Sequence, residues 1–210
     1  MSLHRPSYIP DTGSIALREN AEATLKQILK TAPQDLWLDT IRRISGPQHA
    51  DLVVWMLNQV ECDFAVAVHA FYRSNPGQHL NSPQPLPLQP DATDIFALTL
   101  LNWDKGYYRS HQLQVEACDA PPRMIRQVRQ KAMAHPRGSL PFKLPPRFLA
   151  PEGGQILQLP SHGSPDTADQ LWQLYTSLGL QVAPRNSQPR RPVSTARKLL
   201  DRVSFRRARR

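Results

Sequence analysis

The residues best suited to catalysis are a cysteine and a histidine in one predicted helical segment. Cys62 stands directly before Asp63, which we expect to cap the helix that follows. The positive end of that helix would favour the thiolate of Cys62, the nucleophilic form of a cysteine. His69 lies roughly 10 Å further along the helix axis, too far for direct proton transfer. A thiol nucleophile here would therefore need another base, and His111 and His135 are the candidates.

A structural interpretation explains the same residues, and we favour it. Cysteine is among the most often buried residue types, and a lone histidine is commonly a core or surface residue. A small thiol-dependent enzyme using Cys62 or Cys118 remains the alternative function. The sequence has no Gly-x-Ser-x-Gly elbow, phosphate-binding glycine loop or His-Glu-x-x-His pattern. We therefore assign no catalytic residue and favour a protein that is not an enzyme.

Cysteine usage and hydropathy bear on cofactors and location. The chain has two cysteines, no Cys-x-x-Cys pair and no His/Cys cluster with zinc spacing, so we expect reduced thiols, no metal and no cofactor. Its N-terminus lacks the apolar core of a secretory signal. No apolar stretch approaches the roughly 18 residues of a membrane span. We expect a cytoplasmic protein with no transmembrane segment.

The segment 102–108 mixes aromatic and polar side chains at one predicted turn. Turns of this composition often face a ligand, so Trp103, Asp104 and Tyr107 are candidate ligand-facing residues. We favour a helix-end interpretation instead. In it, Trp103 anchors the last helical turn to the core and Gly106 ends the helix in the left-handed conformation.

Positive charge is concentrated at one end of the chain. The net charge is +9, and residues 185–210 alone hold ten basic side chains against one acid. The preceding residues 1–184 are therefore neutral overall. We predict that this basic tail binds anions. Its predicted anion-binding residues are Arg190, Arg191, Arg197, Lys198, Arg202, Arg206, Arg207, Arg209 and Arg210.

The basic tail has the pattern of an amphipathic helix. Ala196, Leu199, Leu200 and Val203 share one helical face, and basic side chains gather on the other. Such a helix suits nucleic-acid phosphates, an anionic lipid surface or an acidic protein. A disordered, solvated tail is an equal alternative, because isolated helices this short are marginal in water. Phe205 is the only aromatic residue in the tail, so single-strand recognition has little support.

A second basic segment lies inside the neutral part. Residues 120–151 carry seven basic side chains and no acid, so the rest of residues 1–184 is net negative. The segment either pairs with that acidic remainder or offers a second anion-attracting surface. Both possibilities are open at the level of sequence.

Apolar periodicity predicts a helical protein, all-α or nearly so, folded as a compact bundle. Asp51–Gln59 is too apolar for a surface helix, so we place it centrally. Two segments have too many prolines for long helices, the loop 76–90 and the irregular stretch 141–151. The segment 107–115 is strand or loop. The expected helices cover residues 14–30, 33–45, 51–59, 63–74, 95–105, 121–134 and 164–178.

These elements suggest one domain with two appendages. We expect a flexible N-terminus at residues 1–13 and a single helical domain at 14–184 that includes the proline-rich loop 76–90. The basic tail at 185–210 is either disordered or an amphipathic helix.

One segment of the chain resembles a known family. Its matching residues are Glu61, Cys62, Asp63, Ala65, Ala67, Phe71 and Pro76, and Tyr72 stands where the family usually has tryptophan. They resemble the Cys-Asp…Ala…Phe…Pro signature of an uncharacterised family of bacterial helical domains of unknown function. Residues 103–108 and 144–154 are similar to the second half of such proteins, so the resemblance covers about residues 35–155. It implies a bacterial, cytoplasmic, helical protein with no assigned reaction or catalytic residue.

The sequence as a whole favours a non-enzymatic binding or interaction module. Its basic tail would contact an anionic partner, namely nucleic acid or an acidic protein. Binding to nucleic acid should weaken steeply with salt and should be lost when residues 185–210 are removed. A further alternative is association of the tail with anionic membrane surfaces. The native partner and the oligomeric state stay open.

Overall fold

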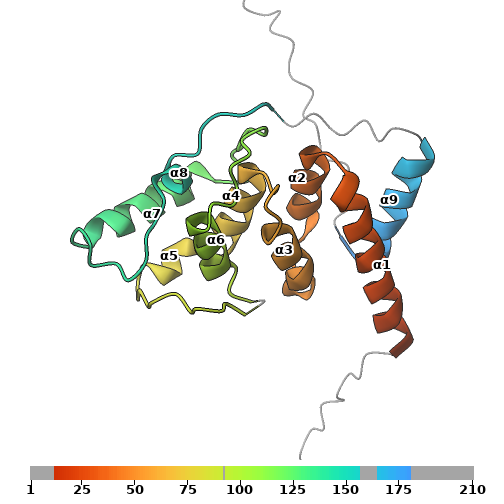
Figure 1. Cartoon of the computed structure of the whole chain (residues 1–210), viewed down its shortest axis with the longest axis horizontal. Helices are drawn as coiled ribbons and strands as arrows, with labels where there is room; N and C mark the ends of the chain where they lie inside the picture. Colours follow the sequence, from red (N-terminus) through yellow and green to blue (C-terminus); the bar gives the residue numbers. More distant parts are fainter. Residues whose placement is uncertain (1–11, 92, 157–164, 181–210) are drawn as a thin grey trace, which may run out of the picture.

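The computed structural model describes residues 12–91, 93–156 and 165–180, and in these residues the chain is helical (Figure 1). The helices are α1 (Thr12–Thr31), α2 (Gln34–Arg43), the 3-10 helix η1 (Pro47–His49), α3 (Ala50–Leu57), α4 (Phe64–Arg73), α5 (Pro76–His79), α6 (Ile95–Asp104), α7 (Pro122–Ala134), α8 (Pro146–Leu149) and α9 (Pro165–Ser177). A single bridge between Leu113 and Gln155 is the β-type pairing found among the described residues. The predicted all-α class is confirmed for this part of the chain.

The ends of the helices follow local sequence signals. The side chain of Asp63 accepts a hydrogen bond from the backbone nitrogen of Ala65 at 2.9 Å, as predicted for the cap of α4. Asp94 caps α6 in the same way through Ala97. Gly106 follows α6 with a φ of 90°, the left-handed conformation that glycine adopts without strain. The helix stop predicted at this glycine is confirmed.

The central helix is α4 rather than α3. Every residue from Phe64 to Tyr72 is buried, and α4 packs between α2 and α6. The prediction that Asp51–Gln59 is central was wrong, because Val53, Val54 and Trp55 are only partly buried in α3. The apolar run of α3 packs against both α6 and α4 and leaves part of its own surface exposed.

Two proline-rich stretches are more ordered than predicted. Pro76 begins the one-turn helix α5 inside the expected loop 76–90, and Leu80 after it is buried. The stretch predicted as irregular contains α8, which also begins with a proline. Proline suits the first turn of a helix, where its missing N–H has no helical partner. The hydroxyl of Tyr72 donates to the carbonyl of Phe148 at 2.7 Å and fastens α8 to α4.

The helix α9 packs beside α1 at one side of the molecule (Figure 1). Tyr175 and Thr40 share a hydrogen bond of 2.7 Å between their hydroxyl groups. The guanidinium of Arg43 also lies over the rings of Trp172 and Tyr175 at 5.1 and 5.2 Å. These contacts tie α9 to α2.

The buried hydrophobic residues form one cluster that runs from Ala21 to Leu180. No helix among the described residues is both long and apolar enough to cross a membrane. Helix α1 begins at Thr12, two residues before the predicted start, so the end of the predicted flexible segment 1–13 is helical. Residues 1–11 and the basic tail lie outside the described residues.

Candidate functional site

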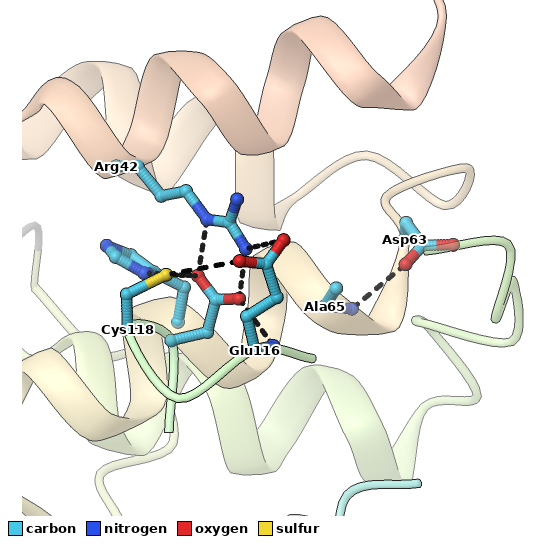
Figure 2. A network of polar contacts seen from close by, with 7 residues as sticks. Arg42, Asp63, Ala65, Glu116 and Cys118 are labelled. Atoms are coloured by element: carbon cyan, nitrogen blue, oxygen red, sulfur yellow. Dashed lines mark hydrogen bonds and ion pairs between the residues drawn. The ribbon is translucent and has the colours of Figure 1, made fainter. Parts of the chain in front are cut away.

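A buried ionic network links α2, α4 and the loop before α7 (Figure 2). Asp119 accepts two hydrogen bonds from the guanidinium of Arg42, one of them at 2.6 Å from Nε. Nδ1 of His69 lies 3.0 Å from the same carboxylate. Glu116 adds a longer ion pair with Arg42 at 3.6 Å. The side chain of Asp119 has no exposed surface, so its charge depends on these partners.

A hydrogen-bonded turn at residues 116–119 orients the carboxylate of Asp119 towards Arg42 and His69. Its second carboxylate oxygen accepts a hydrogen bond from the backbone nitrogen of Glu116 at 2.9 Å, and its own backbone nitrogen donates to the carbonyl of Glu116. Burial acts to raise the pKa of Asp119, but hydrogen bonds from His69 and Arg42 outweigh it and lower the pKa to about 2. Asp119 is therefore ionised. We call this network the charged clamp, because it joins α2, α4 and the loop before α7 through ionic contacts.

Two buried nitrogen atoms of this network, Nη1 of Arg42 and Nε2 of His69, have no hydrogen-bond partner among the residues that the structure describes. The chemistry available to the network is limited, because Asp119 is fully buried and its carboxylate is already paired with Arg42 and His69, which are themselves nearly buried. We interpret it as a structural element that sets the loop before α7 against α2 and α4.

Asp63 is the centre of a second polar cluster. Besides its capping bond, its carboxylate accepts hydrogen bonds from Oγ of Ser110 at 2.8 Å and from the backbone nitrogen of Gln112 at 2.7 Å. The side-chain oxygen of Gln34 accepts from its backbone nitrogen at 2.9 Å. Asp63 thus holds the segment after α6 against the start of α4.

Cys62 lies fully buried beside this cluster, and the environment opposes a nucleophilic role. Burial, followed by the charges of Asp63 and Glu61, raises the pKa of its thiol well above the usual range. The sequence predicted the opposite direction from the positive end of α4. Desolvation wins because the side chain has no contact with water. The structural interpretation of Cys62 fits this geometry.

Cys118 is exposed but lies next to two carboxylates (Figure 2). Its Sγ is 3.8 Å from Oδ1 of Asp119 and 4.0 Å from Oε2 of Glu116. The candidate bases lie in other contacts: Nε2 of His135 is 2.8 Å from the carbonyl of Leu80, and a ring nitrogen of His111 is 2.8 Å from Arg147.

The candidate ligand-facing residues lie at the end of α6, as the helix-end interpretation requires. The ring of Trp103 packs against Phe64 and Phe148 at 5.8 and 5.4 Å. Asp104 is exposed, and Tyr107 is half-buried with its backbone nitrogen donating to Asn102. Trp103 is therefore part of the core packing. None of the three residues lines either cavity found in the described part of the chain.

The basic segment 120–151 provides a surface that the sequence singled out. Six of its seven basic side chains are exposed, and Lys131 is half-buried. In the described part of the chain, no carboxylate lies within ion-pair distance of any of them. The second of the two possibilities raised by the sequence therefore fits the structure. We call these residues the basic surface: Arg123, Arg126, Arg129, Lys131, Arg137, Lys143 and Arg147.

Neither a metal site nor a known relative guides the assignment further. No group of three or more His, Cys, Asp or Glu side chains with metal-binding geometry occurs in the residues that the structure describes. Comparisons with family models, curated proteins and solved structures found no match for this chain. The family resemblance of residues 35–155 therefore stays a prediction. The tail arginines and Lys198 lie outside the described residues.

Sequence reasoning missed the main polar network. It named His69 and Cys118 but neither Arg42 nor Asp119, because the partners are 50 and 77 residues apart along the chain. No local motif announces such a pairing. Glu116 and Asp119 are close enough in sequence to form a hydrogen-bonded turn. Their spacing can therefore predict a turn, but it cannot predict the ionic network with α2 and α4.

Proposed function

We propose that this protein is a non-enzymatic binding module for an anionic macromolecule, with nucleic acid as the partner. The observation that carries the proposal is the basic surface, whose exposed cations have no ion-pair partner in the described part of the chain. Exposed cations without local partners attract phosphate groups, and binding releases the counterions that surround them.

The geometry of α7 supports this role. Val128 is buried on one face of the helix, whereas Arg123, Arg126 and Arg129 are exposed. Residues three apart on a helix are neighbours, so the three guanidinium groups form a row. A row of cations on a fixed helix contacts phosphates without reading base sequence. The basic tail adds nine net positive charges to the same molecule.

A non-enzymatic role is favoured by the surroundings of both cysteines. The thiol of Cys62 is buried with a raised pKa, and Cys118 faces two carboxylates. The proposal includes the cytoplasmic location expected from the sequence.

The test is fluorescence-anisotropy binding of the protein to a labelled mixed-sequence DNA duplex at low and moderate salt. The full chain is compared with a chain that ends at Pro184 and with the variant R123E/R126E. We expect salt-sensitive binding by the full chain, a large loss on truncation and a further loss when both changes are combined. Absence of binding by the full chain at low salt would refute the nucleic-acid proposal. Stronger binding to anionic vesicles than to duplex would favour the membrane alternative.

A further inference from the structure

A groove of about 1130 Å³ lies between the C-terminal half of α7, the loop that follows it and α8. This volume exceeds the roughly 300–1,000 Å³ of typical small-molecule sites, so the groove has room for a segment of polypeptide. We call it the α7–α8 groove.

The α7–α8 groove combines an apolar floor with a basic rim. Its apolar lining includes Leu140, Phe142, Leu144 and Leu149, all of them partly buried. Met133 lies at its edge with 84% of its surface exposed, an unusual state for a large apolar side chain.

The rim of the groove has a single sign of charge. Arg129, Arg137 and Lys143 line it and are exposed, and the described lining residues include no acidic side chain. A second cavity, of about 550 Å³, is lined by Arg73 together with Asp91 and Asp94, so it has both signs. The α7–α8 groove therefore selects for negative charge, and its floor selects for apolar side chains.

The groove is held in place before any ligand binds. Lys131 donates to the carbonyl of Gly77 at 2.9 Å, and Nε2 of His135 is 2.8 Å from the carbonyl of Leu80. Both contacts fasten the second half of α7 to the segment around α5. Three prolines also line the groove and restrict its backbone. A preformed site lowers the entropic cost of binding.

We propose that the α7–α8 groove binds an acidic amphipathic segment of a partner protein. Its carboxylates would pair with the basic rim, and its apolar side chains would cover the floor and Met133. The groove shares Arg129, Arg137 and Lys143 with the basic surface, but its apolar floor is separate from that surface, and this proposal does not depend on nucleic-acid binding.

Other occupants fit the groove less well. The basic tail of this chain has the same sign of charge as the rim and is repelled by it. Among the described lining residues, Phe142 is the only phenylalanine, tyrosine or tryptophan, and it already packs edge-on against Phe96 at 5.4 Å. The ring of His135 is engaged with the carbonyl of Leu80, so nucleic-acid bases lack a stacking platform. A bilayer surface is broad and cannot enter a concave site.

The test uses a fluorescein-labelled synthetic peptide that has glutamates on one helical face and leucines at i, i+3 and i+4 spacing on the other. Two control peptides replace either the leucines with serine or the glutamates with glutamine. The protein is the full chain, as wild type and as the variants R137E/K143E, M133D and R123E/R126E. All four chains are first compared by circular dichroism and by thermal unfolding.

We expect the wild-type chain to bind the amphipathic peptide and both control peptides to bind at least about tenfold more weakly. R137E/K143E and M133D should each weaken binding by about tenfold or more. R123E/R126E makes the same change in charge on α7 outside the groove, and it should alter peptide affinity less than about threefold.

Three results would overturn the proposal. One is a serine-substituted peptide that binds as tightly as the original, because charge alone would then suffice. Another is an equal loss of affinity in R123E/R126E and R137E/K143E, which would indicate a diffuse basic field rather than the groove. The third is absence of peptide binding by a folded wild-type chain. Duplex binding by that same chain would keep the nucleic-acid proposal intact, so the two failures can be told apart.

Discussion

Nδ1 of His69 lies 3.0 Å from Oδ1 of Asp119, and this contact joins α4 to the loop that leads into α7. Because Arg42 of α2 binds the same carboxylate, one buried aspartate connects three elements that are distant in sequence. The start of α7 carries Arg123 and Arg126 of the basic surface. The position of the proposed binding surface therefore depends on a charged clamp in the interior.

Replacing Asp119 with Asn should destabilise the protein by about 3–5 kcal/mol, because the buried guanidinium of Arg42 would lose its nearer counter-charge and keep only the longer ion pair with Glu116. Urea denaturation followed by circular dichroism measures the change in the free energy of unfolding. The matched control is Asp104→Asn at an exposed aspartate, which should change stability by less than about 0.5 kcal/mol. Equal effects of the two substitutions would show that the clamp contributes nothing.

Stability should also fall in acid through the same carboxylate. The pKa of Asp119 is lowered to about 2 in the folded protein, so the unfolded chain takes up this proton at a higher pH than the folded chain. The stabilisation from Asp119 is fully present above about pH 4 and is lost as the pH falls towards 2, with a magnitude of about 2 kcal/mol.

The measurement is the difference in unfolding free energy between wild type and Asp119→Asn across this pH window. The difference should shrink as the pH falls, since the variant has no proton to take up at this position. A difference that stays constant through the window would mean that Asp119 has an ordinary pKa in the folded protein.

Two capping aspartates should differ in their contribution to stability. Asp94→Ala removes one capping bond and should cost about 1 kcal/mol. Asp63→Ala also removes the acceptor of Ser110 and Gln112, and should cost about 3 kcal/mol or more. Both values come from chemical denaturation of the full chain. The interpretation of Asp63 as a polar centre fails if the two substitutions cost the same.

The two cysteines should differ in accessibility. We expect a thiol reagent to modify one thiol per native chain at neutral pH and two after denaturation, because Cys62 is buried and Cys118 is exposed. The variant Cys118→Ser should lose the native reaction and keep its fold. Rapid native labelling of Cys62 in that variant would reopen the thiol-enzyme alternative.

The sequence predicted the elements well where local chemistry decides them. The cap at Asp63 and the helix stop at Gly106 depend on residues within one turn of the chain, so both can be predicted without knowing the fold. The segment 107–115, left open between strand and loop, contains one isolated bridge at Leu113.

Features that depend on tertiary packing could not be predicted from local sequence. The segments of α3 and α4 are both apolar, so the sequence does not show which helix is more deeply buried. Tertiary packing decides that α4 is the central one. No residue pattern around Asp119 predicts its pairing with Arg42 and His69. Exposure of the basic surface likewise follows from the placement of α7, the loop after it and α8, whereas its charge was visible in the sequence from the start.

The salt dependence of duplex binding tests the central claim most directly. Each phosphate contact contributes about −0.9 to the slope of log affinity against log salt concentration. We predict a steep negative slope for the full chain, and a slope shallower by about two contacts for R123E/R126E. An affinity that does not change with salt, or a double variant with the wild-type slope and affinity, would contradict the assignment of the basic surface as a phosphate-binding site.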